Sequence, residues 1–215
     1  MKKISILLIV SITFLISMTS FVQNFNEVKI GNQIWMTENL NVDKFKNGVS
    51  ILQAKTAEEW QKASEKKQPA WCYYKYDSTN GKKYGKLYNW FAVNDPRGLA
   101  PKGWKIPSDD DWTQLTNFLG GKDIAATKMK SKSEWKNNGN GDNESGFTGL
   151  PGGHCFYLGT FEGDNGYWWS STEKDAYTSW ARVMTYSNKG LLGRYDYGKQ
   201  YGFSVRCIKN NHNIF

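Results

Sequence analysis

The sequence predicts a mixed α+β fold in which two or three helices pack against short antiparallel strands joined by long loops. Two observations support this class. Helix patterns with defined ends occur in the first half of the chain, and short stretches rich in aromatic and β-branched residues, typical of strands, occur in the second half. Helices and strands that are grouped along a chain, rather than alternating, favour an antiparallel sheet covered by helices on one side.

Two helices begin at capping boxes, in which a hydroxyl and a carboxylate three residues later satisfy free backbone amides. The first starts at Thr56, with Glu59 as its partner, and ends before Pro69, which cannot continue a helix. The second starts at Ser108, and the aspartates at 109–111 occupy its first turn, where the helix dipole favours negative charge. We interpret these aspartates as caps rather than as metal ligands.

A third, short helix is expected at residues 87–93, before a turn at 95–98. The other elements have the composition of short strands bounded by turn residues. These strands are expected at residues 28–36, with a turn at Gly31 and Asn32, and at 70–76, 156–158, 166–173, 180–186 and 202–208. The intervening segments at 137–146 and 159–166 are expected to be long loops.

The first residues have the features of a secretory signal peptide. Lys2 and Lys3 precede an apolar stretch at 4–16, and small residues at 17–20 offer a cleavage site. We predict a signal peptide at residues 1–20, cut between 19 and 23, and a single domain at residues 24–215. An uncleaved anchor is the alternative, but a span needs roughly 20 apolar residues and this stretch is shorter.

The expected location is outside the cell, either secreted or on the cell surface. No cysteine lies near the cleavage site, so a lipid-anchored lipoprotein is not expected, nor is a membrane span after cleavage. The formal net charge is +8, and small lysine groups at 82–86 and 128–132 are interpreted as solvated surface. Nucleic acid is not expected as a partner of an exported chain with this charge pattern.

Three cysteines follow the signal peptide, at Cys72, Cys155 and Cys207. In an oxidising compartment they predict one disulfide and one free thiol, with three possible pairings. We favour Cys72 with Cys207, because both lie in aromatic or β-branched strand contexts while Cys155 follows glycines in a loop. The alternative is that all three cysteines are reduced and buried.

Six segments carry a resemblance to a known family. They lie at 71–74 (WCYY), 83–93 (KYGKLYNWFAV), 98–112 (GLAPKGWKIPSDDDW), 143–153 (NESGFTGLPGG), 166–173 (GYWWSSTE) and 202–207 (GFSVRC). Their order and spacing resemble the Fibrobacter succinogenes major paralogous domain family, from residue 28 to residue 209. The resemblance implies an exported domain of the C-type-lectin-like group, beside the formylglycine-generating-enzyme fold. It also implies that positions 72 and 207 match the usual cysteines of the family.

A C-type-lectin-like fold implies sugar recognition, through a bound cation or through aromatic stacking. Asn140, Asp142 and Glu144 are the candidate calcium ligands, because a hard cation prefers oxygen, and no other cofactor is expected. Their loop lacks the motifs of calcium-dependent lectins, and its composition also fits ordinary turns. Aromatic residues in or beside the late loops are the candidate ligand contacts. They are Tyr157, Phe161, Tyr167, Tyr195, Tyr197 and Tyr201.

We therefore predict an exported, non-catalytic domain that binds an extracellular or cell-surface ligand, glycan or protein, through loops at 153–166 and 191–201. One alternative is a structural component of the surface or matrix. Another is a thiol-dependent enzyme related to the formylglycine-generating fold. An enzyme is disfavoured because His154 and His212 are the only histidines and no nucleophile and base motif accompanies them.

Overall fold

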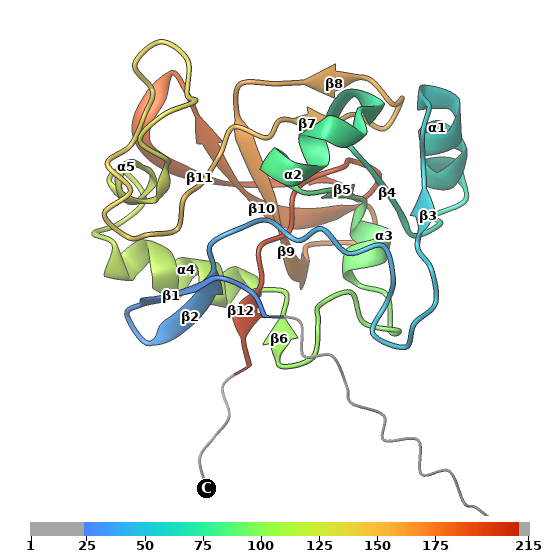
Figure 1. Cartoon of the computed structure of the whole chain (residues 1–215), viewed down its shortest axis with the longest axis horizontal. Helices are drawn as coiled ribbons and strands as arrows, with labels where there is room; N and C mark the ends of the chain where they lie inside the picture. Colours follow the sequence, from blue (N-terminus) through green and yellow to red (C-terminus); the bar gives the residue numbers. More distant parts are fainter. Residues whose placement is uncertain (1–23, 211–215) are drawn as a thin grey trace, which may run out of the picture.

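The computed structural model describes residues 24–210, so the predicted signal peptide lies outside the described residues. Within this range the chain is a mixed α+β structure whose strands form four small sheets (Figure 1). The α+β class is therefore confirmed. The single antiparallel sheet that the sequence suggested is instead divided into separate pieces.

The longest sheet is antiparallel and has the order β11-β10-β9. It contains β9 (Gly166–Glu173), β10 (Thr178–Thr185) and β11 (Asn188–Gly198). A second, four-stranded sheet has the order β1-β2-β12-β6 and brings the two ends of the described chain together. Its strands are β1 (Glu27–Ile30), β2 (Gln33–Met36), β12 (Ile208–Lys209) and β6 (Trp104–Lys105).

The two remaining sheets are smaller. β3 (Leu52–Gln53), β4 (Ala70–Cys72) and β5 (Leu87–Tyr88) form one of them, in which β3 and β4 are parallel. β7 (His154–Cys155) and β8 (Phe161–Glu162) form an antiparallel pair.

The two longest helices begin where the sequence places caps. α1 (Ala57–Glu65) follows Thr56, whose side chain accepts a hydrogen bond from the Glu59 amide. α4 (Asp109–Phe118) has a complete capping box between Ser108 and Asp111. The short helices are η1 (Tyr74–Tyr76), η2 (Ser78–Asn80), α2 (Gly81–Tyr84), α3 (Trp90–Val93) and α5 (Ala125–Met129). Figure 1 shows α1 on the right of the molecule and α4 and α5 on the left.

β9 separates the two largest apolar clusters of the described chain. Trp168 and Trp169 are both fully buried, but successive strand residues point to opposite faces, so each belongs to a different cluster. On the Trp168 face, α4 contributes Trp112 and Leu115. α4 is thereby fixed across the face of the longest sheet.

Several predicted elements differ from the observed ones. Residues 191–201, expected to be a loop, lie mostly in β11, the longest strand. Residues 87–93, expected to be one helix, divide into β5 and α3. The strand expected at 202–208 is largely a run of isolated bridges before β12. In each case the secondary structure depends on pairing with residues far away in the sequence, which the local composition does not indicate.

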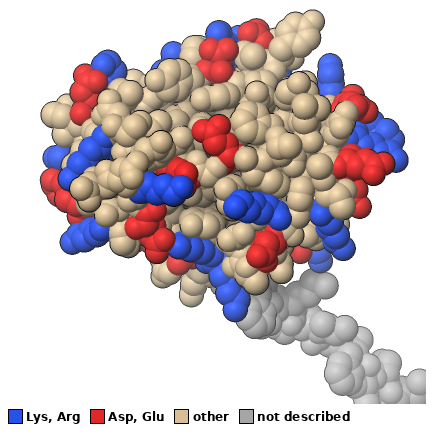
Figure 2. All heavy atoms as spheres, turned by 90° about the horizontal axis from the view of Figure 1, so that it is seen from above, with Lys and Arg blue, Asp and Glu red and all other residues tan. Residues whose placement is uncertain are grey.

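Two lysines that the sequence placed on a solvated face are buried. The ammonium of Lys86 donates to the carbonyl of Asn41, at 2.8 Å, and that of Lys130 to the carbonyl of Thr185, at 2.7 Å. Both amines therefore hold loops together. On the surface, Figure 2 shows basic and acidic side chains interspersed over the face it views, without a large area of one sign.

Candidate functional site

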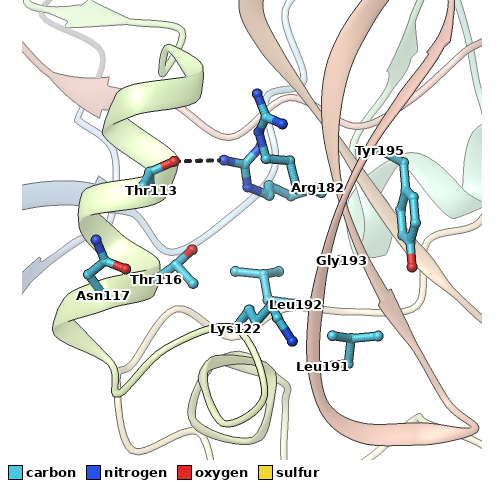
Figure 3. A pocket seen from close by; sticks show the side chains of 10 residues that line it. Thr113, Thr116, Asn117, Lys122, Arg182, Leu191, Leu192, Gly193 and Tyr195 are labelled. Carbon is cyan, nitrogen blue, oxygen red and sulfur yellow. Dashed lines mark hydrogen bonds between the residues drawn. The ribbon is translucent and has the colours of Figure 1, made fainter.

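A pocket of about 470 Å³ opens between α4 and the β10–β11 hairpin. Its lining combines hydroxyl, amide, cationic and apolar side chains. They are Thr113, Thr116, Asn117, Lys122, Arg182, Leu191, Leu192, Gly193, Arg194 and Tyr195. Figure 3 shows Thr113 and Thr116 of α4 facing the hairpin, with the hydroxyl of Thr113 bonded to Arg182, and Tyr195 on the other side of β11.

Two arginines oppose each other at the top of this pocket. Arg182 of β10 and Arg194 of β11 are direct partners in the strand register, and like charges in such positions destabilise a sheet. Asp109, in the first turn of α4, lies between them. Its carboxylate accepts a hydrogen bond of 2.6 Å from Arg182 Nη1 and one of 2.9 Å from Arg194 Nε. The carboxylate therefore converts a repulsive pair into a bridge between helix and sheet.

The cluster of Asp109, Arg182 and Arg194 carries a net positive charge. Burial by itself would raise the pKa of Asp109, but hydrogen bonds and charge from Arg194 and Arg182 outweigh it and hold that pKa below its usual value. One ionised carboxylate thus faces two guanidiniums. Arg182 has a side chain only 2% exposed, whereas that of Arg194 is 45% exposed. The excess charge is accessible at Arg194.

The Arg194 guanidinium is held flat against an aromatic ring. Its Cζ lies 3.4 Å from the centroid of the Trp180 ring, a cation–π contact. Its Nε and Nη2 atoms both bind Asp109, and its Nη1 atom has no hydrogen-bond partner among residues 24–210. Trp180 and Asp109 therefore fix the position of the Arg194 guanidinium, and its Nη1 group remains free to donate to a ligand.

The rest of the lining can bind a ligand, and its ionisable side chains are Lys122 and Tyr195. The hydroxyls of Thr113 and Thr116 donate to helix carbonyls, at 2.8 and 2.7 Å, and remain able to accept. Leu191 and Leu192 supply an apolar wall, and Asn117 an amide. None of the lining side chains is a carboxylate, imidazole or thiol. The pocket is suited to holding a small amphipathic group.

Comparison with known proteins identifies the family. The family model described as the Fibrobacter succinogenes major domain matches residues 28–209. The chain belongs to this family. No curated protein and no solved structure matches it.

In this Fibrobacter succinogenes major domain, two predicted ligand contacts are exposed but lie apart. Tyr195 is 48% exposed and lines the pocket beside α4. Tyr157 is 49% exposed and lines a smaller pocket against α1, together with Gln61 and Ser64. Its ring lies 6.3 Å from that of Tyr201, which is half-buried. The predicted aromatic residues therefore do not form one platform.

The other predicted aromatic contacts belong to the packing of the domain. Tyr167 is buried and stacks on Phe203, with ring centroids 5.1 Å apart. Tyr197 is half-buried and packs edge-on against the same phenylalanine, with ring centroids 4.9 Å apart. Phe161 packs edge-on against Tyr76, at 4.8 Å. These side chains hold the late strands together.

The candidate calcium ligands make local contacts in the family domain. The side chain of Asn140 accepts from the Trp135 amide and that of Asp142 from the Glu144 amide, each at 2.9 Å. Glu144 forms an ion pair with Lys128, at 3.2 Å. Residues 24–210 contain no group of three or more His, Cys, Asp or Glu side chains placed to hold a metal ion. Calcium binding at this loop stays a prediction.

The cysteines differ from the predicted pairing. Cys72, Cys155 and Cys207 are all free and buried, so the disulfide expected between Cys72 and Cys207 is not formed in the structure. The thiol next to Cys72 is that of Cys155. Cys207 lies in a different apolar cluster, where burial raises its pKa to about 12.

Sequence reasoning missed the charged residues of the pocket. Asp109 was interpreted as a cap, but Asp111 is the capping residue and Asp109 binds the two arginines. The sequence contains one indication of this ion cluster, the two arginines Arg182 and Arg194. They can be recognised as neighbours only when residues 188–198 are known to form a strand paired with β10.

Among the described residues no helix has the length and apolar character needed to cross a bilayer.

Proposed function

We propose that this protein is an exported, C-type-lectin-like binding domain that recognises an extracellular glycan, and that the pocket between α4 and β11 holds an acidic sugar of that glycan. The observation that carries the proposal is the half-exposed guanidinium of Arg194, which presents the excess positive charge of the ion cluster at the pocket.

Charge supports an anionic ligand. Asp109 already neutralises one of the two arginines, so a ligand carboxylate would balance the second and would meet the open Nη1 edge of Arg194. Hydrogen bonds between a guanidinium and a carboxylate are among the stronger ones in proteins. Because Arg194 is fixed by Trp180 and Asp109, little side-chain entropy is lost on binding.

Shape and polarity support a sugar rather than a bare ion. A volume of about 470 Å³ lies within the usual range of small-molecule sites. The leucine wall matches the apolar face of a pyranose, while Thr113, Thr116 and Asn117 offer partners for its hydroxyls. The mixture of an exposed guanidinium, several hydroxyl partners and an apolar wall fits a uronic acid residue.

Isothermal titration calorimetry with trigalacturonic acid and with its fully methyl-esterified form tests the proposal, because the two ligands differ chiefly in charge. We expect the acid to bind and the ester to bind at least tenfold more weakly. Equal affinities for the two ligands, or no binding of the acid, would contradict the proposal.

Two further comparisons locate the site. Arg194→Gln should weaken binding of the acid about tenfold or more, because a charged hydrogen bond contributes roughly 1.5–3 kcal/mol. Lys82→Gln, an exposed lysine outside the pocket, is the matched control and should leave affinity unchanged. Repeating the titration in EDTA distinguishes binding at the arginine pocket from binding through a calcium ion. Binding that persists in EDTA supports the arginine pocket, and binding that is lost would indicate a calcium site instead.

A further inference from the structure

Two of the three cysteines lie side by side in the third apolar cluster. Cys72 ends β4, Cys155 ends β7, and both are fully buried next to Trp60 and Leu87. The Cys155 thiol is the ionisable group that neighbours the Cys72 thiol. The hydroxyl of Tyr76 lies near both thiols and donates a hydrogen bond of 2.9 Å to the Gly159 carbonyl.

The backbone holds these two residues in a fixed relation. Cys72 is paired with Leu87 in the β4–β5 ladder, and the next residue, Tyr88, bridges Phe203. Gly202, the residue before Phe203, forms a β-bridge with Cys155 through two backbone hydrogen bonds of 2.9 and 2.8 Å. A continuous hydrogen-bonded path therefore connects β4 to β7, and the contact between the thiols does not depend on a mobile loop.

Gly202 shows how closely this region is packed. A Cβ atom at that position would lie 3.0 Å from the Cβ of Cys155 and 2.9 Å from the Trp60 ring. The absence of a side chain at Gly202 lets β7 approach the cluster in which Cys72 lies. Cys207, by contrast, is in the cluster that contains Trp169 and Phe203, which is a different cluster from that of Cys72 and Cys155.

We propose that Cys72 and Cys155 form the disulfide of this protein and that Cys207 is the free thiol. A small-molecule disulfide such as oxidised glutathione is the oxidant. One cysteine thiolate attacks it, giving a mixed disulfide and one glutathione thiol. The second cysteine thiolate then displaces the other glutathione, so two protein thiols become one disulfide and two glutathione thiols are released.

The burial of the thiols determines whether the disulfide forms before or after the protein has folded. Burial raises the pKa of Cys72 well above its usual value, and the neighbouring Cys155 thiol raises it further. Because the thiolate is the attacking species, exchange is slow once the cluster has formed. The disulfide therefore forms during folding, before α1 and Tyr76 cover the pair. Once formed, it links β4 to the β7–β8 hairpin, which carries the loop of Tyr157.

Peptide mapping tests the pairing without any mutation. The purified protein is refolded in reduced and oxidised glutathione, remaining thiols are alkylated, and trypsin is added. Cleavage after Lys and Arg places Cys72, Cys155 and Cys207 in separate peptides, 68–75, 137–174 and 207–209. We expect mass spectrometry to find 68–75 linked to 137–174 and 207–209 alkylated. A link to 207–209, or three alkylated peptides, would overturn the proposal.

Thermal unfolding gives an independent test. Closing a long loop should make the oxidised protein more stable, so reductant should lower its Tm by about 5–15 °C. Cys207→Ala should keep this difference, and Cys155→Ala should abolish it. A wild-type Tm that does not respond to reductant, or a Cys155→Ala variant with the same response as wild type, would overturn the pairing.

Discussion

At the scale of single residues, Asp109 determines how α4 is attached to the longest sheet. Asp109→Asn keeps the side-chain shape but removes the charge that separates Arg182 from Arg194. We expect a loss of about 3–5 kcal/mol in the free energy of unfolding, because a buried charge is left without its partner. Urea denaturation measures this loss.

Asp110→Asn is the matched control for that experiment. Asp110 lies in the same first turn of α4 but is exposed and takes no part in an ion pair among the described residues. Its replacement should cost only about 0.3–1 kcal/mol, from the helix dipole. If both variants lose the same stability, the arginine bridge does not hold the helix to the sheet.

His154 gives the residue-scale prediction for pH. It is 3% exposed among the rings of Phe156, Tyr167 and Phe203, and its Nδ1 atom has no hydrogen-bond partner within residues 24–210. Burial lowers its pKa to about 4. Between the unfolded value of about 6.5 and this folded value, the unfolded chain binds more protons than the folded protein.

The free energy of unfolding should therefore decrease as pH falls from about 6.5 toward 4, by up to about 1.4 kcal/mol per pH unit from this group. His154→Phe suits the aromatic surroundings and removes the titrating group. The difference in stability between wild type and His154→Phe, measured by denaturation across that range, isolates the effect. A difference that stays constant with pH would show that the folded imidazole accepts a proton readily.

At the scale of elements, those with local signals could be predicted, whereas β11, whose composition does not favour a strand, could not. α4 begins at Ser108 because its capping box is complete within four residues, and the β1–β2 hairpin turns at Gly31, which has a φ of +60°. β11 has the opposite character. Its sequence, NKGLLGRYDYG, is rich in glycine and charge, and it becomes a strand through its ladder with β10.

The absence of a side chain at Gly153 allows β7 to pack closely against β8. Gly153 has a φ of +67° just before β7, and a Cβ there would lie 2.5 Å from the Glu162 carbonyl oxygen on the neighbouring strand. Gly103 has a φ of +86° but open space around it. Both alanine variants should cost about 1–2 kcal/mol for the positive φ, and Gly153→Ala should cost about 1–3 kcal/mol more for the clash.

Guanidinium denaturation of the two variants measures this difference. Equal losses would mean that β7 and β8 can separate freely, and the element would then not be held by close packing at Gly153.

At the scale of the whole molecule, the pocket is assembled from segments that the sequence does not connect. The prediction placed recognition at 153–166 and 191–201, and the pocket includes the first part of the second segment, from Leu191 to Tyr195. Its other side comes from α4, which local reasoning treated only as a capped helix. The sequence revealed the family and the two capped helices, α1 and α4, while the register of Arg182 against Arg194 required the folded sheet.

The arrangement of the two large clusters on opposite faces of β9 predicts how the domain unfolds. Trp168 and Trp169 are adjacent in the chain, and each is fully buried in a different cluster. Because they share one strand, loss of β9 would expose both clusters, and we expect a single cooperative transition.

Trp168→Ala and Trp169→Ala should each lower the free energy of unfolding by about 3–5 kcal/mol, through the cavity that each leaves. In each variant, and in wild type, circular dichroism of the backbone and fluorescence of the remaining tryptophans should give the same urea midpoint. Phe118→Ala, which removes a side chain 64% exposed on α4, is the control and should change stability little. Separate midpoints for the two signals in either tryptophan variant would show that the clusters unfold independently and that β9 does not couple them.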